Sequence, residues 1–448
     1  MVSKRTQELL QADAEQLLHP MYTVGQNRGI VMEKAHGIYL VDTEGKEYID
    51  LTSQLMCVNL GHRRQEIIDA VTKAMNEIDF VTTFFGITNP YIIEVSQKLA
   101  KLTPGDLNHF HYTSGGSEAI DSVIKLARMY WGRKGLAGKY KIISLYSSYH
   151  GSSGVSTTLT GLGRGLMQNP FGPVSPGFIH VPPPYSYRSM FGDAPDCGQT
   201  SIYFLEEVIK AEGPESIAAF IAEPILGAAG MIELPAQWWP QVAEICKKYG
   251  ILLIVDEVMS GFARTGKMFA CENWNIKGDF MTMAKGIVNS ALPFGAVALS
   301  DEVYDVLKDA FLMHGFTYSG NPLSAAASSA ALDIYVRDKV AENAVRVGNH
   351  IKQRLEAEFL PLPSVGCIDG RGVFQAIELV KDKESKEPID PAVKEELWQK
   401  MFDAGLFSRI AGWLGNRVFI TPPCTITIEE TDKALDIVYP LIAALKPK

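Results

Sequence analysis

Residues 110–131, with the sequence FHYTSGGSEAIDSVIKLARMYW, join a short apolar strand, a glycine turn and an amphipathic helix. In the helical part, apolar residues recur three and four positions apart and therefore share one face: Ile120, Val123, Ile124, Ala127 and Trp131. Glycines let the backbone approach an anion closely, and the free N–H groups at a helix start favour negative charge. The turn at 114–117 is therefore a candidate phosphate site, and a serine cap on an ordinary helix is the simpler alternative.

The same alternation continues on both sides of this segment. Other apolar runs are separated by stretches with helical periodicity, and the runs that read as buried strands are residues 110–113, 141–146, 218–223 and 251–255. Strands that alternate with helices in this way are typical of an α/β fold with a mostly parallel central sheet. We therefore predict this fold class for the main part of the chain.

The length of 448 residues exceeds the usual size of one cooperative core, so two or three domains are expected. Near the start, residues 37–51 read as two short strands around a turn at 43–46. Beyond about residue 330 the pattern changes to a helix, strands near 372–380 and 417–420, and a last helix. We therefore predict three parts: an N-terminal segment 1–60 that joins the small domain, a large domain 61–330, and a smaller α+β domain 331–448.

The composition excludes several classes of protein. With 46% hydrophobic, 21% charged and 10% aromatic residues, the chain can bury a large core and is not a disordered protein. The formal net charge of −9 leaves no basic excess that would neutralise a nucleic-acid backbone or an anionic membrane. No stretch offers the roughly 20 uninterrupted apolar residues that a membrane helix needs. We therefore expect neither nucleic acid nor a membrane as a partner.

The cysteines and histidines point away from metal binding and secretion. The six cysteines are scattered and form no CxxC pair, which fits the reduced thiols of an intracellular protein better than a zinc site. The first residues, MVSKRTQELLQADAEQ, lack the apolar core of a secretory signal. His109 and His111 alternate along a predicted strand without a third ligand nearby. We therefore expect a cytoplasmic protein without a metal site.

Two further polar residues stand where buried strands should end. Asp256 follows one apolar run, and ligands of open α/β sheets bind at such strand ends; a helix cap or an ion pair with Arg264 would also explain it. Lys285 follows another apolar run and precedes Gly286. A desolvated lysine has a depressed pKa and can form an imine with an aldehyde. Pyridoxal phosphate (PLP) requires an anion site, an anionic partner for its ring nitrogen and an amine that binds its aldehyde. The chain offers all three, so we predict this cofactor.

The motifs of the chain follow a recognisable order. They are SGGSEA at 114–119, SYHG at 148–151, AEP at 222–224, DEVMSGFARTG at 256–266, AKG at 284–286 and TYSGNP at 317–322. With these six motifs the chain resembles, over nearly its whole length, a class III (ω-amino acid type) PLP-dependent aminotransferase. The resemblance implies fold type I, in which the large domain binds PLP.

The resemblance assigns the central chemistry to four residues. Lys285 would bind the cofactor aldehyde and shuttle the proton, and Asp256 would hold the protonated pyridine nitrogen. Gly116 and Ser117 would bind the phosphate. The residues that the motifs single out therefore account for both ends of the cofactor.

Four more residues are implied around the cofactor. Tyr149 would stack on one face of the ring and Val258 on the other, and Thr317 would reach the phosphate in the neighbouring subunit. Glu223 is expected near the cofactor, where it is either a site residue or a structural carboxylate at a strand end. Because Thr317 would serve the neighbouring site, the resemblance implies a homodimer, with a tetramer as a further option.

The acceptor is suggested by a missing charge pair. Family members that act on ornithine or 4-aminobutyrate resemble one another in a glutamate after the glycine of EP-x-x-G, paired with an arginine three residues before a PP pair. Here the two positions hold Ala228 and Phe419, so the chain looks more like the ω-amino acid:pyruvate group. That group holds a substrate carboxylate with an arginine on the preceding loop. Arg409 is the best match, and Arg417 is the second choice.

The substrate pocket is implied by four apolar residues: Leu55, Met56, Phe84 and Phe85. They would form an apolar wall, although ordinary core packing explains each of them almost as well. The expected amino donor is an amine, a short ω-amino acid or an amino sulfonate of the β-alanine or taurine type. The expected acceptor is a keto acid, pyruvate before others, in a ping-pong reaction.

Other functions share part of these observations. An aminomutase or a decarboxylating transaminase has the same fold and cofactor, and a 2-oxoglutarate-using ω-aminotransferase differs only in its acceptor. A dehydrogenase would use residues 114–119 for a dinucleotide, and an inactive family member would act as a scaffold. The presence of Lys285, Asp256 and Thr317 together favours a working aminotransferase.

Overall fold

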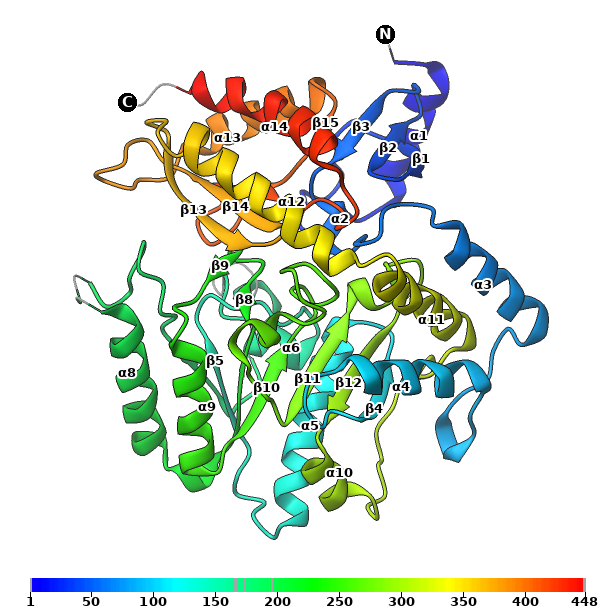
Figure 1. Cartoon of the computed structure of the whole chain (residues 1–448), viewed down its shortest axis with the longest axis vertical. Coiled ribbons are helices and arrows are strands. Elements are labelled where there is room, and N and C mark those ends of the chain that lie inside the picture. The colour runs from blue at the N-terminus through cyan, green and yellow to red at the C-terminus, as the bar shows by residue number, and fades with distance from the viewer. Residues whose placement is uncertain (1, 164–167, 173, 193, 195, 446–448) are drawn as a thin grey trace.

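The computed structural model of the chain describes residues 2–163, 168–172, 174–192, 194 and 196–445. At its centre lies a sheet of seven strands: β4 (His109–Thr113), β5 (Lys141–Leu145), β6 (Phe178–Val181), β7 (Ile217–Ala222), β10 (Leu252–Asp256), β11 (Phe280–Ala284) and β12 (Gly295–Leu299). Their order across the sheet is β4-β12-β11-β10-β7-β5-β6 (Figure 1). The four strands predicted from apolar runs are confirmed as β4, β5, β7 and β10.

The sheet is parallel except for one strand. β5 pairs in parallel with β6 and β7, and β10 pairs in parallel with β7 and β11. β12 runs antiparallel to both of its neighbours, β11 and β4, so β4 shares the direction of the parallel strands. A mostly parallel central sheet was predicted, and it is confirmed. The carboxyl ends of all strands except β12 consequently lie at one edge of the sheet.

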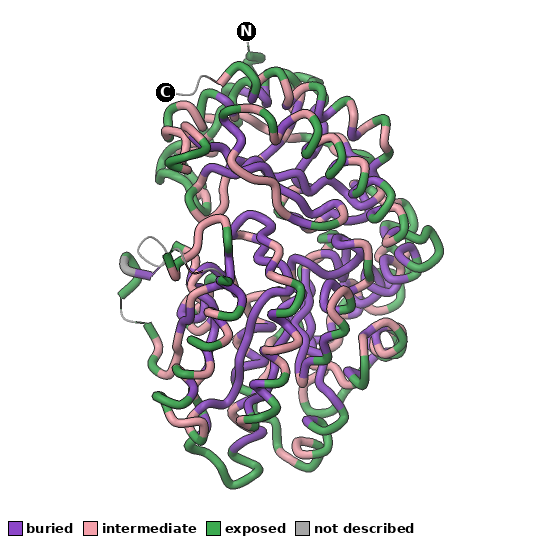
Figure 2. Tube along the Cα trace, turned by 60° about the vertical axis from the view of Figure 1, so that its left-hand side comes forward, coloured by how far each residue is buried: buried purple, intermediate pink, exposed green. Residues whose placement is uncertain are grey.

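Helices cover both faces of this sheet. On one face α5 (Gly116–Arg133) packs against β11 and β12, and the five apolar residues assigned to its inner face are all buried. On the other face lies α9 (Trp238–Tyr249). Leu252 and Ile254 of β10 belong to the core with α5, whereas Leu253 and Val255 belong to the core with α9. Figure 2 shows the buried trace through the centre. Burial on both sides explains why this strand is apolar up to its last residue, Asp256.

The C-terminal part builds a smaller α+β layer, at the top in Figure 1. Its antiparallel sheet has the strands β13 (Val365–Arg371), β14 (Phe374–Leu379), β17 (Arg417–Ile420) and β16 (Ile410–Ala411), in this order. Its helices are α12 (Val340–Arg354), α13 (Pro391–Asp403) and α14 (Ile428–Ala443). The strands predicted near 372–380 and 417–420 are confirmed. The loop on which Arg409 was expected is interrupted by the short strand β16, which pairs with β17.

The N-terminal strands join this C-terminal layer. The predicted hairpin is confirmed as β2 (Tyr39–Asp42) and β3 (Glu47–Asp50), and β1 (Met32–His36) pairs with β2. β3 also pairs in parallel with β15 (Leu406–Phe407), so both ends of the chain share one sheet. On this pairing we propose to keep the domain division at 1–60, 61–330 and 331–448.

The remaining helices and short strands connect these layers. They are α1 (Lys4–Gln16), α2 (Ser53–Met56), α3 (Gln65–Glu77), η1 (Phe84–Gly86), α4 (Pro90–Leu102), α6 (Gly154–Leu159), η2 (Asn169–Phe171), α8 (Cys197–Glu212), η3 (Pro214–Ser216), β8 (Ile225–Leu226), β9 (Ile232–Glu233), η4 (Ala270–Trp274), η5 (Lys285–Val288), α10 (Asp301–Leu307), α11 (Pro322–Arg337) and the π-helical turn η6 (Leu355–Phe359). Among the described residues, none of the helices combines the length and the apolarity that a membrane crossing requires.

The central strand gives a direct test of this core. Ile254 of β10 is completely buried, so Ile254→Ala leaves a cavity and should lower the free energy of unfolding by about 2–5 kcal/mol. Denaturant titration of the purified protein measures this change. Leu136→Ala is the control, because Leu136 is 48% exposed and its truncation should cost less than about 0.5 kcal/mol. Equal losses for the two variants would contradict the assigned core.

Candidate functional site

The predicted site residues gather at the carboxyl edge of the central sheet. Residues 114–117 follow β4, and Tyr149 lies four residues beyond the end of β5. Glu223 follows β7 directly, Asp256 is the last residue of β10, and Lys285 follows β11 directly. Because these strands run in the same direction, segments distant in sequence meet at one edge, where ligands of α/β sheets bind.

Asp256 is held by three hydrogen bonds. One carboxylate oxygen, Oδ2, lies 2.7 Å from His150 Nδ1. The other, Oδ1, accepts from the Thr282 hydroxyl at 2.9 Å and from the Val258 N–H at 3.0 Å. The alternative pairing with Arg264 does not occur, because the Arg264 guanidinium donates to backbone oxygens and to a serine hydroxyl. These contacts fix the plane of a carboxylate that is only 3% exposed.

His150 is the main site residue that the sequence reasoning missed. It lies in the quoted SYHG motif, yet no role was assigned to it. Its side chain is completely buried, and within the described part of the chain its Nε2 has no hydrogen-bond partner. Its position beside the strand-end carboxylate follows from the neighbouring places of β5, β7 and β10 in the sheet. The motif thus drew attention to this histidine, but its hydrogen bond to Asp256 could not be predicted without the order of the strands.

Glu223 serves the backbone of its neighbours. Its Oε1 accepts from the Tyr149 N–H at 2.9 Å, and its Oε2 accepts from the Gly227 N–H at 2.9 Å. The pKa of Glu223 is raised to about 7, chiefly by burial; His150 opposes this shift and the Asp256 charge adds to it. Of the two readings, the contacts match the structural carboxylate at a strand end, which fixes the chain at Tyr149.

Lys285 presents an amine that is not tied down. Among the described residues, no hydrogen bond or ion pair holds its Nζ. Burial lowers the pKa of Lys285; Cys57, Asp256 and Glu223 counteract this, and the Arg264 cation reinforces it. Its backbone has a φ of 52°, a left-handed conformation that costs a non-glycine residue about 1–3 kcal/mol. A strained backbone and a partly neutral amine together suit a nucleophilic lysine.

The glycine turn forms the start of α5. A Cβ at Gly116 would lie 2.8 Å from Val258 Cγ1, so only glycine lets Val258 pack this closely against the turn. The Ser117 hydroxyl accepts from the Ser152 N–H at 3.1 Å. Because the helix has 18 residues and its first N–H groups lack helical partners, its N-terminus favours an anion. The turn therefore has the form of a phosphate site, with Val258 packed against it.

The two candidate arginines differ sharply in their surroundings. Arg409 is half-buried, and among the described residues no group accepts a hydrogen bond from its guanidinium. Burial lowers the pKa of Arg409, and the Tyr149 phenol partly offsets this. Arg417, in contrast, is 1% exposed and donates to Glu378 at 2.9 Å and to Asp369 at 2.9 Å. The second choice is thus committed to an internal network, and Arg409 remains free for a ligand.

The positions of the missing charge pair do lie together. Ala228 and Phe419 belong to one apolar cluster, which also contains Met56. Phe419 is 1% exposed and Met56 is 5% exposed. Met56 thus packs within this cluster, whereas Leu55 beside it is 55% exposed. Where the enzymes that act on ornithine or 4-aminobutyrate pair a glutamate with an arginine, this chain therefore has two apolar residues in one cluster.

The remaining predicted residues form a separate, exposed group. Thr317 is exposed, and Phe85 is 95% exposed. The Phe84 ring lies against Gly315, two residues from Thr317. In the described part of the chain, no hydrogen bond, ion pair or ring contact links this group to Lys285 or Asp256. Phe84 therefore lies near the segment that carries Thr317, and none of the three residues has a contact of these kinds with Lys285 or Asp256 in the described part of the chain.

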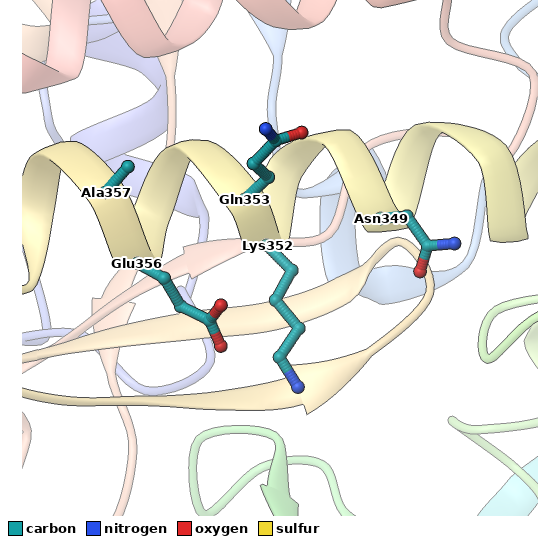
Figure 3. Close-up of a pocket in the computed structure, with 5 residues that line it drawn as sticks. All are labelled: Asn349, Lys352, Gln353, Glu356 and Ala357. Carbon is teal, nitrogen blue, oxygen red and sulfur yellow. The ribbon is translucent and has the colours of Figure 1, made fainter.

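A hollow on the outer side of α12 contains none of the predicted site residues. Its lining side chains come from α12 and the adjoining turn: Asn349, Lys352, Gln353, Glu356 and Ala357 (Figure 3). All five are exposed, and Lys352 and Glu356 point in one direction whereas Gln353 points in the other. This surface feature is distinct from the edge of the central sheet.

Comparison with known proteins agrees with this geometry. A family model described as aminotransferase class-III matches residues 21–442. The chain belongs to this family. A putrescine–pyruvate aminotransferase of Pseudomonas aeruginosa is 36% identical, over 91% of the chain and 89% of that protein. A diaminobutyrate–2-oxoglutarate transaminase of Halomonas elongata is 34% identical, over 91% of the chain and 89% of that protein.

Solved structures show the same fold. An (S)-enantioselective ω-transaminase from Thermomicrobium roseum superposes with a TM-score of 0.92 at 38% identity, and the match covers 98% of each chain. The chain is therefore a PLP-dependent aminotransferase of fold type I, of the ω-amino acid or amine type. Its residues fit the cofactor, because the N–H groups at the start of α5 favour an anion and no hydrogen bond among the described residues ties down the Lys285 amine.

The lysine can be tested by chemical trapping. Reduction of the holoenzyme with borohydride should fix PLP to the peptide that contains Lys285. Because burial lowers the pKa of Lys285, more of its amine is neutral near pH 8 than for a solvated lysine, whose pKa is about 10.4. Reconstitution of the apoenzyme should therefore proceed near pH 8 and slow as the pH falls through the lowered pKa, because protonation removes the nucleophile.

Peptide mass mapping and absorbance measure both effects. Lys285→Ala should abolish the label and the transamination without unfolding the protein. The peptide of the exposed Lys267 is the internal control for non-specific reduction. Labelling at another lysine with the same yield, or unchanged transamination in Lys285→Ala, would show that the assignment is wrong.

Proposed function

We propose that this aminotransferase moves the amino group of an amine, a short ω-amino acid or an amino sulfonate to pyruvate. β-Alanine and taurine are the proposed types of acidic donor. The observation that carries the proposal is the combination of one unpaired guanidinium, Arg409, with the apolar cluster of Ala228 and Phe419. This combination offers a partner for one carboxylate and none for a second.

Pyruvate matches this arrangement better than 2-oxoglutarate. Pyruvate has one carboxylate, which Arg409 binds beside Tyr149. 2-Oxoglutarate has a second carboxylate, and a buried charged group left unpaired costs at least about 1–3 kcal/mol. The P. aeruginosa relative is named for pyruvate and supports the first acceptor. The H. elongata relative is named for 2-oxoglutarate, which makes an enzyme that uses 2-oxoglutarate the second candidate.

The chemistry at the cofactor ring rests on two residues. PLP supplies an aldehyde and an electron sink when it is bound. Asp256, oriented by His150 and Thr282, holds the ring nitrogen in its protonated form. Lys285 would hold the cofactor through its aldehyde, and its amine, once free, would move the proton. Buried, fixed hydrogen-bond partners need little reorganisation during such a step.

The other site residues orient the cofactor. Gly116 and Ser117 would hold the phosphate at the start of α5. Tyr149, whose backbone N–H is held by Glu223, would hold one face of the ring, and Val258 would hold the other. Fixing the cofactor at both ends would orient the substrate for the chemistry that PLP supplies.

A homodimer is proposed as the complete enzyme. Exposed apolar residues surround Thr317, among them Phe85 at 95% and Tyr318 at 60% exposure. The Phe80 and Tyr318 rings lie 6.1 Å apart, so this surface is continuous between segments distant in sequence. Apolar patches of this kind mark protein interfaces. In the dimer, Thr317 reaches the phosphate of the partner's cofactor, and Phe84 and Phe85 with Leu55 line the substrate entrance.

Free cysteines support a cytoplasmic location.

The acceptor is tested by a screen with pyruvate and 2-oxoglutarate against putrescine, β-alanine and taurine. We expect kcat/KM for pyruvate to exceed that for 2-oxoglutarate about tenfold or more, since an unpaired carboxylate costs at least about 1–3 kcal/mol. Stoichiometric loss of the keto acid separates transamination from mutase or decarboxylase activity. A preference for 2-oxoglutarate would establish the second candidate instead.

The role of Arg409 is tested within the same screen. Arg409→Ala should raise the KM for pyruvate and for β-alanine, because both carry a carboxylate. The KM for putrescine should change little, because a diamine carries none. Equal losses with putrescine and β-alanine would contradict a role in carboxylate binding.

The dimeric site is tested by mixing two inactive variants. Lys285→Ala lacks the reacting amine, and Thr317→Val lacks a phosphate contact while its shape is kept. In a mixed dimer, one site combines Lys285 of one chain with Thr317 of the other and is intact. At limiting PLP we therefore expect activity to return after mixing, up to about half of the wild-type value per mixed dimer. No recovery, with mixed dimers shown by mass measurement, would place Thr317 in the site of its own chain.

A further inference from the structure

Arg417 opens β17, and only 1% of its surface is exposed. Its Nε and Nη2 donate to Glu378 Oε2 at 2.9 and 2.5 Å, and Nη2 also donates to Asp369 Oδ2 at 2.9 Å. The remaining nitrogen, Nη1, donates to the backbone oxygen of Gly230 at 2.6 Å. Every nitrogen of the guanidinium therefore has a partner, as the burial of a charge requires.

The partners of Arg417 come from both layers of the molecule. Glu378 and Asp369 lie on β14 and β13 of the small antiparallel sheet. Gly230 lies between β8 and β9, and Tyr185, whose hydroxyl also accepts from Nη2, lies between β6 and α8. Both of these segments connect strands of the central sheet with helices that follow them. One side chain therefore bridges the two layers and fixes their separation at this point.

Two glycines make room for the stem of this arginine. A Cβ at Gly230 would lie 2.0 Å from Arg417 Cδ, and a Cβ at Gly412 would lie 3.1 Å from the same atom. Gly230 has a φ of 117° and Gly412 a φ of 93°, both in the left-handed region that favours glycine. Backbone of both layers is thus shaped around the Arg417 side chain.

The same contacts hold the hairpin that carries Arg409. Arg409 immediately precedes β16, and in this hairpin Ala411 pairs with Arg417 of β17. In the turn between the two strands, the Trp413 N–H donates to the Ala229 backbone oxygen at 2.9 Å. The hairpin is therefore fastened at Arg417 and at Trp413 to residues 229–230.

The segment at 227–230 leads directly to the cofactor-binding edge. Glu223 accepts from the Gly227 N–H at 2.9 Å and from the Tyr149 N–H at 2.9 Å. The Tyr149 phenol also acts on the pKa of Arg409 through its charge. Hydrogen bonds thus link Arg417 through residues 227–230 and Glu223 to Tyr149, and Arg409 belongs to the hairpin at which this path begins.

We propose that Arg417 is a positioning residue that sets the place of Arg409 over the cofactor-binding edge. It thereby determines the affinity for the carboxylate of a substrate that Arg417 itself does not touch. The proposal rests on the proposed function in one respect, namely that Arg409 binds this carboxylate. A displacement of a binding group by about 1 Å costs up to about a hundredfold in rate, so a small shift of the hairpin is measurable.

The test compares Arg417→Lys and Tyr185→Phe with the wild-type holoenzyme. Lysine keeps the charge but lacks the planar fork that arginine offers to Glu378, Asp369 and Gly230. Phenylalanine removes a single hydroxyl and perturbs folding least. We expect the KM for β-alanine and pyruvate to rise about tenfold in Arg417→Lys and less in Tyr185→Phe, with kcat changed less than about threefold and the KM for putrescine unchanged. Hydrogen–deuterium exchange of residues 408–417 should rise in the same order.

The matched control is Arg371→Lys, which alters an exposed ion pair with Glu233 and should leave every KM unchanged. In an Arg409→Ala background, Arg417→Lys should have no further effect on the KM for β-alanine, because the two residues act through one contact. Equal rises in KM for putrescine and β-alanine, or full additivity with Arg409→Ala, would overturn the proposal.

Failure of the proposed function gives a different pattern. If the wild-type holoenzyme accepts neither donor, the substrate assignment is wrong, and hydrogen exchange decides the positioning role alone. Faster exchange of residues 408–417 in Arg417→Lys and Tyr185→Phe, with unchanged exchange in Arg371→Lys, would then support it. Unchanged exchange in all variants would overturn it.

Discussion

The parallel pairing of β10 with β7 and β11 places Glu223, Asp256 and Lys285 at the same buried edge of the sheet. Because desolvation is costly, a charged group in such a place needs partners, or its pKa shifts toward the neutral form. Backbone N–H groups satisfy Glu223, and His150 with Thr282 satisfies Asp256. Of these three residues, only Lys285 has no hydrogen bond or ion pair with another described residue. Its amine is therefore the group at this edge that is left to react.

The sequence was most informative where one physical signal dominated. The apolar run 251–255 predicted a strand because burial on both faces removes any polar alternation, and the helix after Gly116 was readable from its 3.6-residue period. The strand β12, Gly295–Leu299, was not predicted from the sequence. Its residues are small, and its antiparallel place between β4 and β11 is decided by tertiary pairing and not by local preference.

The contacts within the site were less predictable than its members. Asp256 and His150 lie 106 positions apart, so their hydrogen bond depends on the order of strands, which no local pattern states. The two readings of Glu223 differ only in which atoms it contacts, and the structure shows backbone N–H groups of Tyr149 and Gly227. Thr317 and Phe85 could be assigned a role only through the family resemblance. Both are exposed, and they would contribute to a site only in the proposed homodimer.

Arg409 and Arg417 show how one hairpin separates structure from recognition. Arg417 is buried with two carboxylates and a backbone oxygen around it, so its charge is already compensated and attracts no further anion. Arg409 stands near the other end of the hairpin, half-buried and without a carboxylate partner among the described residues. Its desolvation is partly complete before a ligand arrives, and an incoming carboxylate would recover the lost interaction. In the proposed function, the compensated arginine would keep the hairpin in place, and the uncompensated one would provide the affinity for the carboxylate.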